Sequence, residues 1–219
     1  MNYINIHKHS PCISNEICIQ DLIIGKDKIQ ILPNKHYSVG IHPWFINNIE
    51  QQKQDLVEVS HKKNVIAIGE TGLDFQKDIL LHTPVNLQLD LFKFQIELAY
   101  KRQKPLIIHC VKCFDELIKL KKQYKDSIPW IIHGFSKNSN IANQLIKNDF
   151  YLSFGHHLLQ SEKNKEALIG VPKEKIFFET DDKNLPIEKI YEEAAFLLKT
   201  SVKILNNQIA ENYKSIFYI

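Results

Sequence analysis

The chain has 219 residues, of which 44% are hydrophobic and 24% are charged. This composition is typical of an ordinary globular protein and excludes a disordered chain or a fibre. Lysine and arginine together number 28 against 25 aspartates and glutamates, so the formal net charge of +3 is too even to indicate a nucleic-acid surface by charge alone. Ten histidines against seven glycines stand out, and their positions become the first question.

The sequence also limits where the protein resides and how it is organised. No apolar run approaches the roughly 18 residues that a membrane span needs, and residues 1–5 do not resemble a secretory signal. We therefore expect a cytoplasmic protein that binds no membrane. The four cysteines are sparse for this length, so no disulfide framework is expected. With no internal repeat or Pro/Ser-rich linker, residues 1–219 are expected to form a single domain, and no obligate protein partner is inferred.

Short apolar runs and longer amphipathic stretches alternate along the chain. The short runs are rich in Ile, Val and Phe, which is typical of strands buried on both faces of a parallel sheet. These strands are expected at residues 3–6, 28–32, 36–41, 65–69, 105–108, 129–132, 150–154 and 175–179. Helices are expected at residues 49–62, 84–102, 114–125, 138–147, 162–170, 186–200 and 202–213.

The prolines and the alternation of elements indicate the fold. Pro84 can open its helix because a first-turn residue has no intrahelical N–H to lose, while Pro105 and Pro129 stand at strand starts. Alternating strands and helices predict right-handed crossovers and a parallel sheet. Eight strands favour a compact (β/α)8 TIM barrel, with an open doubly wound sheet as the alternative. Residues 10–27 are too short for a long first helix, so that unit is expected to be abbreviated.

Good metal ligands follow five of the eight predicted strands at their carboxyl ends, where barrel enzymes carry their chemistry. These ligands are His7, His9, Glu70, His109, His133 and Asp181. Because His7 and His9 are two residues apart, the strand period projects both imidazoles to the same side. Histidines and carboxylates without a convincing thiolate set suit Zn, Mn, Fe or Mg. Six ligands exceed one tetrahedral site, whereas two ions about 4 Å apart and bridged by Glu70 would use them all.

Six short runs carry a more specific signal. They are residues 5–9 (NIHKH), 40–43 (GIHP), 67–74 (AIGETGLD), 104–110 (KPLIIHC), 133–136 (HGFS) and 179–181 (ETD). In this order they resemble the motifs of the TatD-type metal-dependent deoxyribonucleases, within the amidohydrolase-like TIM-barrel hydrolases. The resemblance covers nearly the whole chain, and the GE-x-GLD run is highly specific.

This resemblance implies an activity and a ligand set. It implies a barrel with a divalent metal centre that hydrolyses phosphodiesters, commonly as a 3′–5′ exonuclease on single strands of nucleic acid. By motif position, one metal ion would be held by His7, His9, Glu70 and Asp181, and the second by Glu70, His109 and His133. The two divalent ions would be Mg, Mn or Zn.

The chain departs from the family pattern near the expected substrate. The family usually has Asp at the position of Asn5, Arg at Val111 and Pro at Lys183. Val111 removes a guanidinium that could hold phosphate bidentately. The long loop that usually follows the last Asp is also shortened, because residues 182–185 lead directly to Pro186 and a helix. The wall of the substrate site is therefore expected to be reduced.

A mechanistic hypothesis assigns roles to the remaining polar residues. Two divalent ions would lower the pKa of a bound water and give hydroxide near neutral pH for attack on phosphorus. Asp181 and Glu70 are the catalytic candidates, with Asp181 receiving or orienting the proton of the water. His42 would contact the phosphate as a hydrogen-bond donor. Asp74 and Glu179 would support the ligands from behind or serve the structure.

Further side chains near the strand ends have weaker assignments. The missing arginine could be partly replaced by Lys8, Lys112 or Lys137. His156 and His157 follow the seventh strand and are expected to face solvent. Two tryptophans, Trp44 and Trp130, offer either stacking surfaces or parts of the core.

Two other function classes stay open. Cys110 and Cys113 form a C-x-x-C at a strand-to-helix junction, where the helix N-terminus can lower a thiol pKa, as in a redox protein. That class leaves the other ligands unexplained. The second class keeps the barrel and its metals but hydrolyses a small-molecule amide, lactone or phosphoester. Glu70 stands where the dihydroorotase-like branch would need a lysine able to carry a carbamate bridge, which weighs against that branch.

Overall fold

The structure is a computed structural model and describes residues 2–124 and 128–218. The strands are β1 (Tyr3–Lys8), β2 (Glu16–Ile23), β3 (His36–Gly40), β4 (Val65–Asp74), β5 (Leu106–Val111), β6 (Trp130–Ile132), β7 (Phe150–Phe154) and β8 (Ile176–Phe178). The strand order follows the chain from β1 to β8. Parallel strands in sequence order are the topology of a (β/α)8 barrel.

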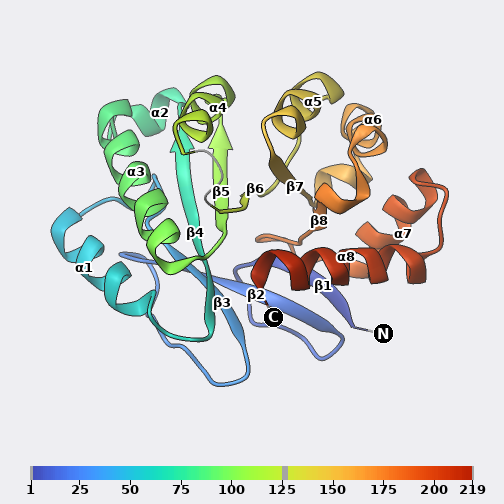
Figure 1. Cartoon of the computed structure of the whole chain (residues 1–219), viewed down its shortest axis with the longest axis horizontal. Coiled ribbons are helices and arrows are strands. Elements are labelled where there is room, and N and C mark those ends of the chain that lie inside the picture. The colour runs from blue at the N-terminus through green and yellow to red at the C-terminus, as the bar shows by residue number, and fades with distance from the viewer. Residues whose placement is uncertain (1, 125–127, 219) are drawn as a thin grey trace. The chain divides into compact units, whose positions relative to one another are not determined.

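Helices follow most of the strands (Figure 1). They are α1 (Ile49–Val59), α2 (Lys77–Leu80), α3 (Val85–Arg102), α4 (Phe114–Gln123), α5 (Ser139–Lys147), α6 (Glu162–Gly170), α7 (Ile187–Leu197) and α8 (Val202–Phe217), with the short 3-10 helices η1 (His156–Leu159) and η2 (Lys173–Lys175). The seven predicted helices are confirmed with small shifts at their ends, and α2 was not predicted. The predicted end of the third helix at Lys125 lies outside the described residues.

Contacts group the chain into two compact units. The first unit comprises Met1–Gln20 and Ile131–Ile219, and the second comprises Asp21–Trp130. In the first unit β1 pairs in parallel with β2, with Asn5 opposite Cys18, and β7 pairs with β8, with Ser153 opposite Phe177. Helix α8 packs against β1 and β8.

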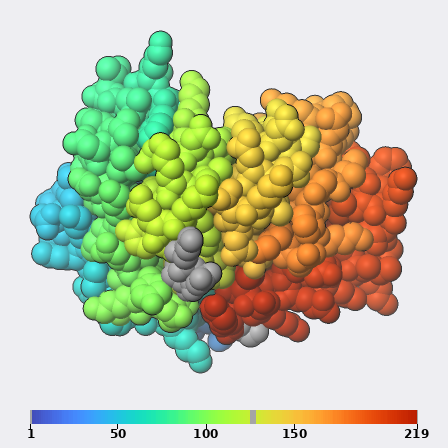
Figure 2. Space-filling view, turned by 45° about the horizontal axis from the view of Figure 1, so that its top comes forward, coloured from blue at the N-terminus to red at the C-terminus, as the bar shows by residue number. Residues whose placement is uncertain are grey.

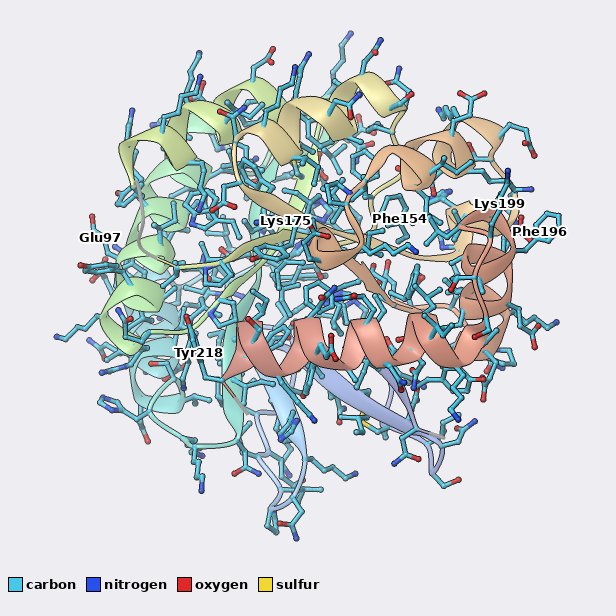
Figure 3. All side chains as sticks on the ribbon, turned by 45° about the vertical axis from the view of Figure 1, so that its right-hand side comes forward. Glu97, Phe154, Lys175, Phe196, Lys199 and Tyr218 are labelled. Atoms are coloured by element: carbon cyan, nitrogen blue, oxygen red, sulfur yellow. A yellow bond between two sulfur atoms is a disulfide. The ribbon has the colours of Figure 1, made fainter. Side chains whose placement is uncertain are left out.

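The helices of the first unit cover some aromatic residues and leave others exposed. The neighbouring helices α5 and α6 present their side chains next to each other in Figure 2, in yellow and orange. Phe154 of β7 is completely buried, whereas Phe196 of α7 is 78% exposed and projects outward in Figure 3. The Tyr191 hydroxyl of α7 donates to the carbonyl of Ile4 at 2.9 Å and so ties this helix to β1.

The second unit is built around β4, which is buried along its whole length. This strand pairs in parallel with β3 and with β5, and Gly72 stands opposite His109. Helix α3 packs on β4, and two of its buried glutamines reach the backbone where strands end. Gln95 bonds both the N–H and the carbonyl of Ile41, and Gln88 does the same for Asp74. Amide side chains thereby satisfy backbone groups that would otherwise be buried without partners.

The strand predicted at residues 28–32 is wrong. These residues form no strand, and Ile29 and Ile31 are only half-buried. The second strand is instead β2, whose polar residues interrupt the apolar pattern by which strands are recognised. Glu16 is buried in it because its carboxylate accepts hydrogen bonds from Asn5 and Lys8. No helix lies between β1 and β2 among the described residues, so this connection is indeed abbreviated.

The four cysteines form two different pairs. Cys12, in the segment after β1, forms a disulfide with Cys18 of β2. The small number of cysteines did not predict this bond. Cys110 and Cys113 are thiols whose sulfur atoms lie 3.3 Å apart. Among the described helices, none combines the length and the apolarity that crossing a bilayer requires.

Candidate metal centre

The first unit brings four predicted ligands together where β1, β6 and β8 end. His7, His133 and Asp181 each offer a ligand atom, and these atoms lie within 4.8 Å of one another. The Oδ1 atom of Asp181 is 3.6 Å from Nε2 of His7 and 3.2 Å from Nε2 of His9. Two histidines at the strand period therefore face one carboxylate. We call His7, His9, His133 and Asp181 the first cluster.

The backbone holds Asp181 next to β1. Its N–H donates to the carbonyl of His7 at 3.0 Å, and its carbonyl accepts from the N–H of His9 at 3.3 Å. The preceding residue, Thr180, is bound by Asn5, which accepts from the Thr180 N–H and donates to the Thr180 hydroxyl. Asn5 therefore fixes the chain beside Asp181.

Electrostatics keep Asp181 ionised. Burial is the largest single effect and would raise the pKa of this carboxyl, but hydrogen bonds with His7 and His9 and the charges of His7 and His133 hold the pKa well below its ordinary value. An ionised carboxylate among imidazoles is a suitable ligand for a divalent cation.

Glu179 supports the first cluster from behind. It is completely buried, and its Oε1 atom accepts from the N–H of Gly134 at 2.8 Å and lies 3.3 Å from Nδ1 of His133. A carboxylate on one ring nitrogen orients an imidazole whose other nitrogen binds a metal. Glu179 is therefore placed to orient His133 in this way, and its supporting role stays a prediction.

The second unit holds a second cluster, formed by His42, Glu70 and His109, all of which are buried. The Oε1 atom of Glu70 lies 3.0 Å from Nε2 of His42 and 2.9 Å from Nδ1 of His109. The sequence predicts that His42 contacts the substrate, and its contact with Glu70 also makes it a potential ligand. Nothing in its spacing could have indicated this, because the contact depends on how the turn after β3 meets the middle of β4.

Asp74 holds the other side of His109. It is completely buried and accepts from Nε1 of Trp44 at 2.8 Å and the N–H of Gln76 at 2.9 Å, and it lies 3.0 Å from Nε2 of His109. Burial would raise its pKa, but these hydrogen bonds, led by the one with His109, keep the pKa well below its ordinary value. His109 thus has a carboxylate at each ring nitrogen.

An exposed indole stands beside the second cluster. Trp44 is 49% exposed, and its ring centroid lies 5.1 Å from that of His42 and 5.6 Å from that of His109. Trp130, by contrast, is completely buried and packs on Phe92, so it belongs to the core. Of the two tryptophans, Trp44 is therefore the one whose exposed ring could stack on a base.

The lysines suggested as replacements for the missing arginine differ in surroundings. Lys8 is buried and its ammonium lies 2.5 Å from Oε1 of Glu16, so this lysine is committed to the structure. Lys112 is exposed after β5, and Lys137 is half-buried after β6. The suggestion is therefore wrong for Lys8.

Both clusters pass a chemical test for a divalent ion. Their donors are imidazole nitrogens and carboxylate oxygens, which lie within 4.8 Å of one another for His7, His133 and Asp181 and for the second cluster. His9 joins the first cluster through its contact with Asp181. Such donors suit Zn, Mn or Mg. The thiols of Cys110 and Cys113 are in neither cluster, and the Cys113 thiol donates to the carbonyl of Leu73 at 3.1 Å.

Comparison with known proteins agrees with this chemistry. The family model of the TatD related DNases matches residues 12–218. The chain belongs to this family. Of its relatives, the uncharacterized metal-dependent hydrolase YabD of Bacillus subtilis is 29% identical over 201 residues, which cover 83% of this chain and 77% of that protein. Deoxyribonuclease Tat-D of Schizosaccharomyces pombe is 27% identical over 157 residues, which cover 66% of this chain and 50% of that protein.

A solved structure extends the comparison to the fold. The crystal structure of YjjV, a TatD homologue from Escherichia coli, has a TM-score of 0.79 and 18% sequence identity, and the match covers 92% of this chain and 86% of that chain. The predicted (β/α)8 barrel and the predicted membership of the TatD family are confirmed, and with the family comes the class of metal-dependent hydrolases that act on ester bonds.

Proposed function

We propose that this TatD family protein is a cytoplasmic phosphodiesterase that cleaves nucleic acid with two divalent ions, Mg, Mn or Zn. The observation that supports it is the pair of clusters, each built around one carboxylate oxygen that faces two imidazoles. The first cluster would hold one ion. Glu70 and His109 would hold the other, with His42 as an additional ligand or a phosphate contact.

Different residues of the two clusters would have different roles in hydrolysis. A bound divalent ion lowers the pKa of its water and polarises phosphoryl oxygens. Asp181, whose Oδ1 atom faces His7 and His9, would take the proton of the attacking water. Asp74 and Glu179 hold His109 and His133 in place, so that little reorganisation is needed during the reaction.

Nucleic acid is the proposed substrate for two reasons. The deoxyribonuclease of fission yeast is a relative of this chain, and the exposed indole of Trp44 lies next to the second cluster. Stacking of a base on an aromatic ring contributes roughly 1–3 kcal/mol and is tolerant of sequence, which suits a 3′–5′ exonuclease on single strands.

The second candidate function is hydrolysis of a small-molecule ester or amide at the same metal centre. It is favoured by Val111, which offers no positive charge, and by the short segment 182–185 after Asp181. Both features reduce the surface that could hold a polymer. The two functions share the ligands and differ in the substrate.

One experiment tests the proposed function. Metal content is measured on the purified protein, and single strands of DNA and RNA labelled at the 3′ or 5′ end are digested with Mg²⁺, Mn²⁺ or Zn²⁺. We expect early release of the 3′ label as a mononucleotide. His109→Ala should lower the rate at least about 100-fold with an unchanged circular dichroism spectrum, while His82→Ala, at an exposed histidine, should not.

Two outcomes would contradict the proposal. Turnover of a small phosphoester or amide without cleavage of any strand would establish the second candidate function. Full activity of His109→Ala would show that the second cluster is not the catalytic site.

A further inference from the structure

Five basic side chains follow the carboxyl ends of β6, β7 and β8 in the first unit. They are Lys137, His156, His157, Lys163 and Lys183, which we call the basic rim. Lys137 follows β6, the two histidines begin η1 after β7, Lys163 lies in the first turn of α6, and Lys183 follows β8. They therefore come from the same ends of the strands as His133 and Asp181.

The members of the basic rim lie close to one another. The rings of His156 and His157 have centroids 4.0 Å apart. The pKa of His157 is lowered first by the partial burial of its imidazole and then by the positive charges of His156, Lys137, Lys183 and Lys163. Charges that repel the protonated form of one imidazole must lie near it. The rim is thus a local concentration of positive charge in a chain whose net charge is only +3.

The acidic residues within the rim do not cancel this charge. Asp182 is paired with Lys183 at 2.9 Å, and Glu162 is paired with Lys165, which lies outside the rim, at 3.1 Å. Lys137 and Lys163 have no carboxylate partner in these two pairs, and Lys163 is exposed. Their ammonium charges are therefore available to an anion.

The basic rim adjoins the first cluster directly. Gly155, which precedes η1, lies beside Glu179: a Cβ added to it would be in ordinary van der Waals contact with the Cγ atom of that glutamate, at 3.5 Å. Glu179 in turn contacts His133. Leu158 is buried and anchors η1, while His157 is exposed and His156 half-buried. On the other side, Lys183 is only two residues from Asp181 in the chain.

We infer that the basic rim binds the phosphodiester backbone of a single nucleic-acid strand and leads it to Asp181. This inference rests on the proposed function and specifies how the substrate is held. The rim supplies positive charge from three successive strand ends of the first unit. The origin of its members from separate loops favours a polymer over an isolated phosphate, because side chains on separate loops can contact successive phosphates.

Binding without catalysis is the first test. The metal-free protein in a chelator is titrated into a fluorescein-labelled twelve-nucleotide single strand at several salt concentrations. We compare Lys137→Gln/Lys163→Gln/Lys183→Gln with the matched triple Lys147→Gln/Lys173→Gln/Lys203→Gln. The control lysines are exposed in the same unit, and Lys147 and Lys173 precede the amino ends of β7 and β8.

The rim triple should bind the strand at least about tenfold more weakly at low salt than the unchanged protein. The slope of log K against log salt should fall by roughly 2, because each phosphate that a lysine neutralises on a single strand contributes about 0.7 to it. The control triple should bind like the unchanged protein. Equal binding by the two triples would overturn the inference.

Turnover separates failure of the rim from failure of the proposed function. With metal present, the KM for the twelve-nucleotide strand should rise in the rim triple by at least about tenfold more than the KM for bis(4-nitrophenyl) phosphate. Equal rises would show that the lysines act on the metal cluster and would overturn the rim. If the unchanged protein cleaves no strand at all, the proposed function is wrong, whatever the binding result.

Discussion

At the scale of single residues, both clusters rely on a carboxylate oxygen that faces two imidazoles. Oδ1 of Asp181 faces His7 and His9, and Oε1 of Glu70 faces His42 and His109. A neutral imidazole carries one donor and one acceptor nitrogen, so each such contact fixes a tautomer. Residues behind the ligands, such as Asp74, therefore decide which nitrogen remains for a metal.

Replacing Asp74 tests this dependence. Asp74→Asn keeps the shape of the side chain but removes the charge that faces Nε2 of His109. We expect a loss of about 10- to 100-fold in metal affinity or in activity, as is usual for a carboxylate behind a histidine ligand. Isothermal titration with Mn²⁺ measures the affinity, and Asp78→Asn at an exposed position of α2 is the matched control. Equal affinities for the two variants would contradict the role of Asp74.

Asn5 illustrates how a departure from the family pattern is accommodated. Its amide donates to Oε2 of Glu16 at 3.0 Å, and Glu16 also pairs with Lys8. Asn5→Asp would restore the usual residue of the family but would place two carboxylates face to face in a buried position. We expect the free energy of unfolding to fall by about 2 kcal/mol, measured by urea denaturation. Asn140→Asp, exposed on α5, should change it by less than about 0.5 kcal/mol.

A second substitution identifies the cause. Adding Glu16→Gln to Asn5→Asp removes one of the two opposed carboxylates and supplies an amide that can donate to the other. The double-mutant cycle should give a favourable coupling energy of roughly 1–3 kcal/mol. Additive effects would show that Asn5 and Glu16 do not interact.

At the scale of elements, β4 brings backbone close to backbone at the second cluster. Gly72 has a φ of +136°, and an added Cβ would lie 2.1 Å from the carbonyl oxygen of His109. Gly72→Ala should therefore lower the free energy of unfolding by more than about 2 kcal/mol. Gly170 stands at the end of α6, and the nearest atom to the methyl of Gly170→Ala would be 4.0 Å away. The free energy of unfolding of this variant should stay the same or rise by roughly 0.5 kcal/mol. Urea denaturation measures the free energy of unfolding of both variants. An equal loss in Gly72→Ala and Gly170→Ala would contradict the close backbone approach at Gly72.

The sequence predicted elements and strand-end ligands better than it predicted contacts. Helices such as α3 carry a local apolar period, and ligands such as His109 directly follow an apolar strand, so both signals lie within a few neighbouring residues. The second strand was misplaced because the burial of Glu16 depends on Asn5, eleven residues away. In the same way, no local pattern could show that Trp44 donates to Asp74, thirty residues further on.

At the scale of the whole molecule, each compact unit contains its own cluster of imidazoles and carboxylate. If each cluster binds an ion only in the folded protein, metal should add to stability in two separable parts. The contribution of one site is about 2.7 kcal/mol when the free ion is at 100 times its Kd. For a chain of this length that corresponds to a rise in Tm of roughly 5–11 °C per site.

Thermal unfolding with and without Mn²⁺ tests this additivity. His9→Ala removes a ligand of the first cluster and His42→Ala removes one of the second. Each variant should lose about half of the metal-dependent rise in Tm, and the double variant should lose nearly all of it. His82→Ala, at an exposed histidine, should keep the full rise. If either single variant abolished the whole rise, the two clusters would not bind ions independently, because loss of a ligand in one unit would then empty the site in the other.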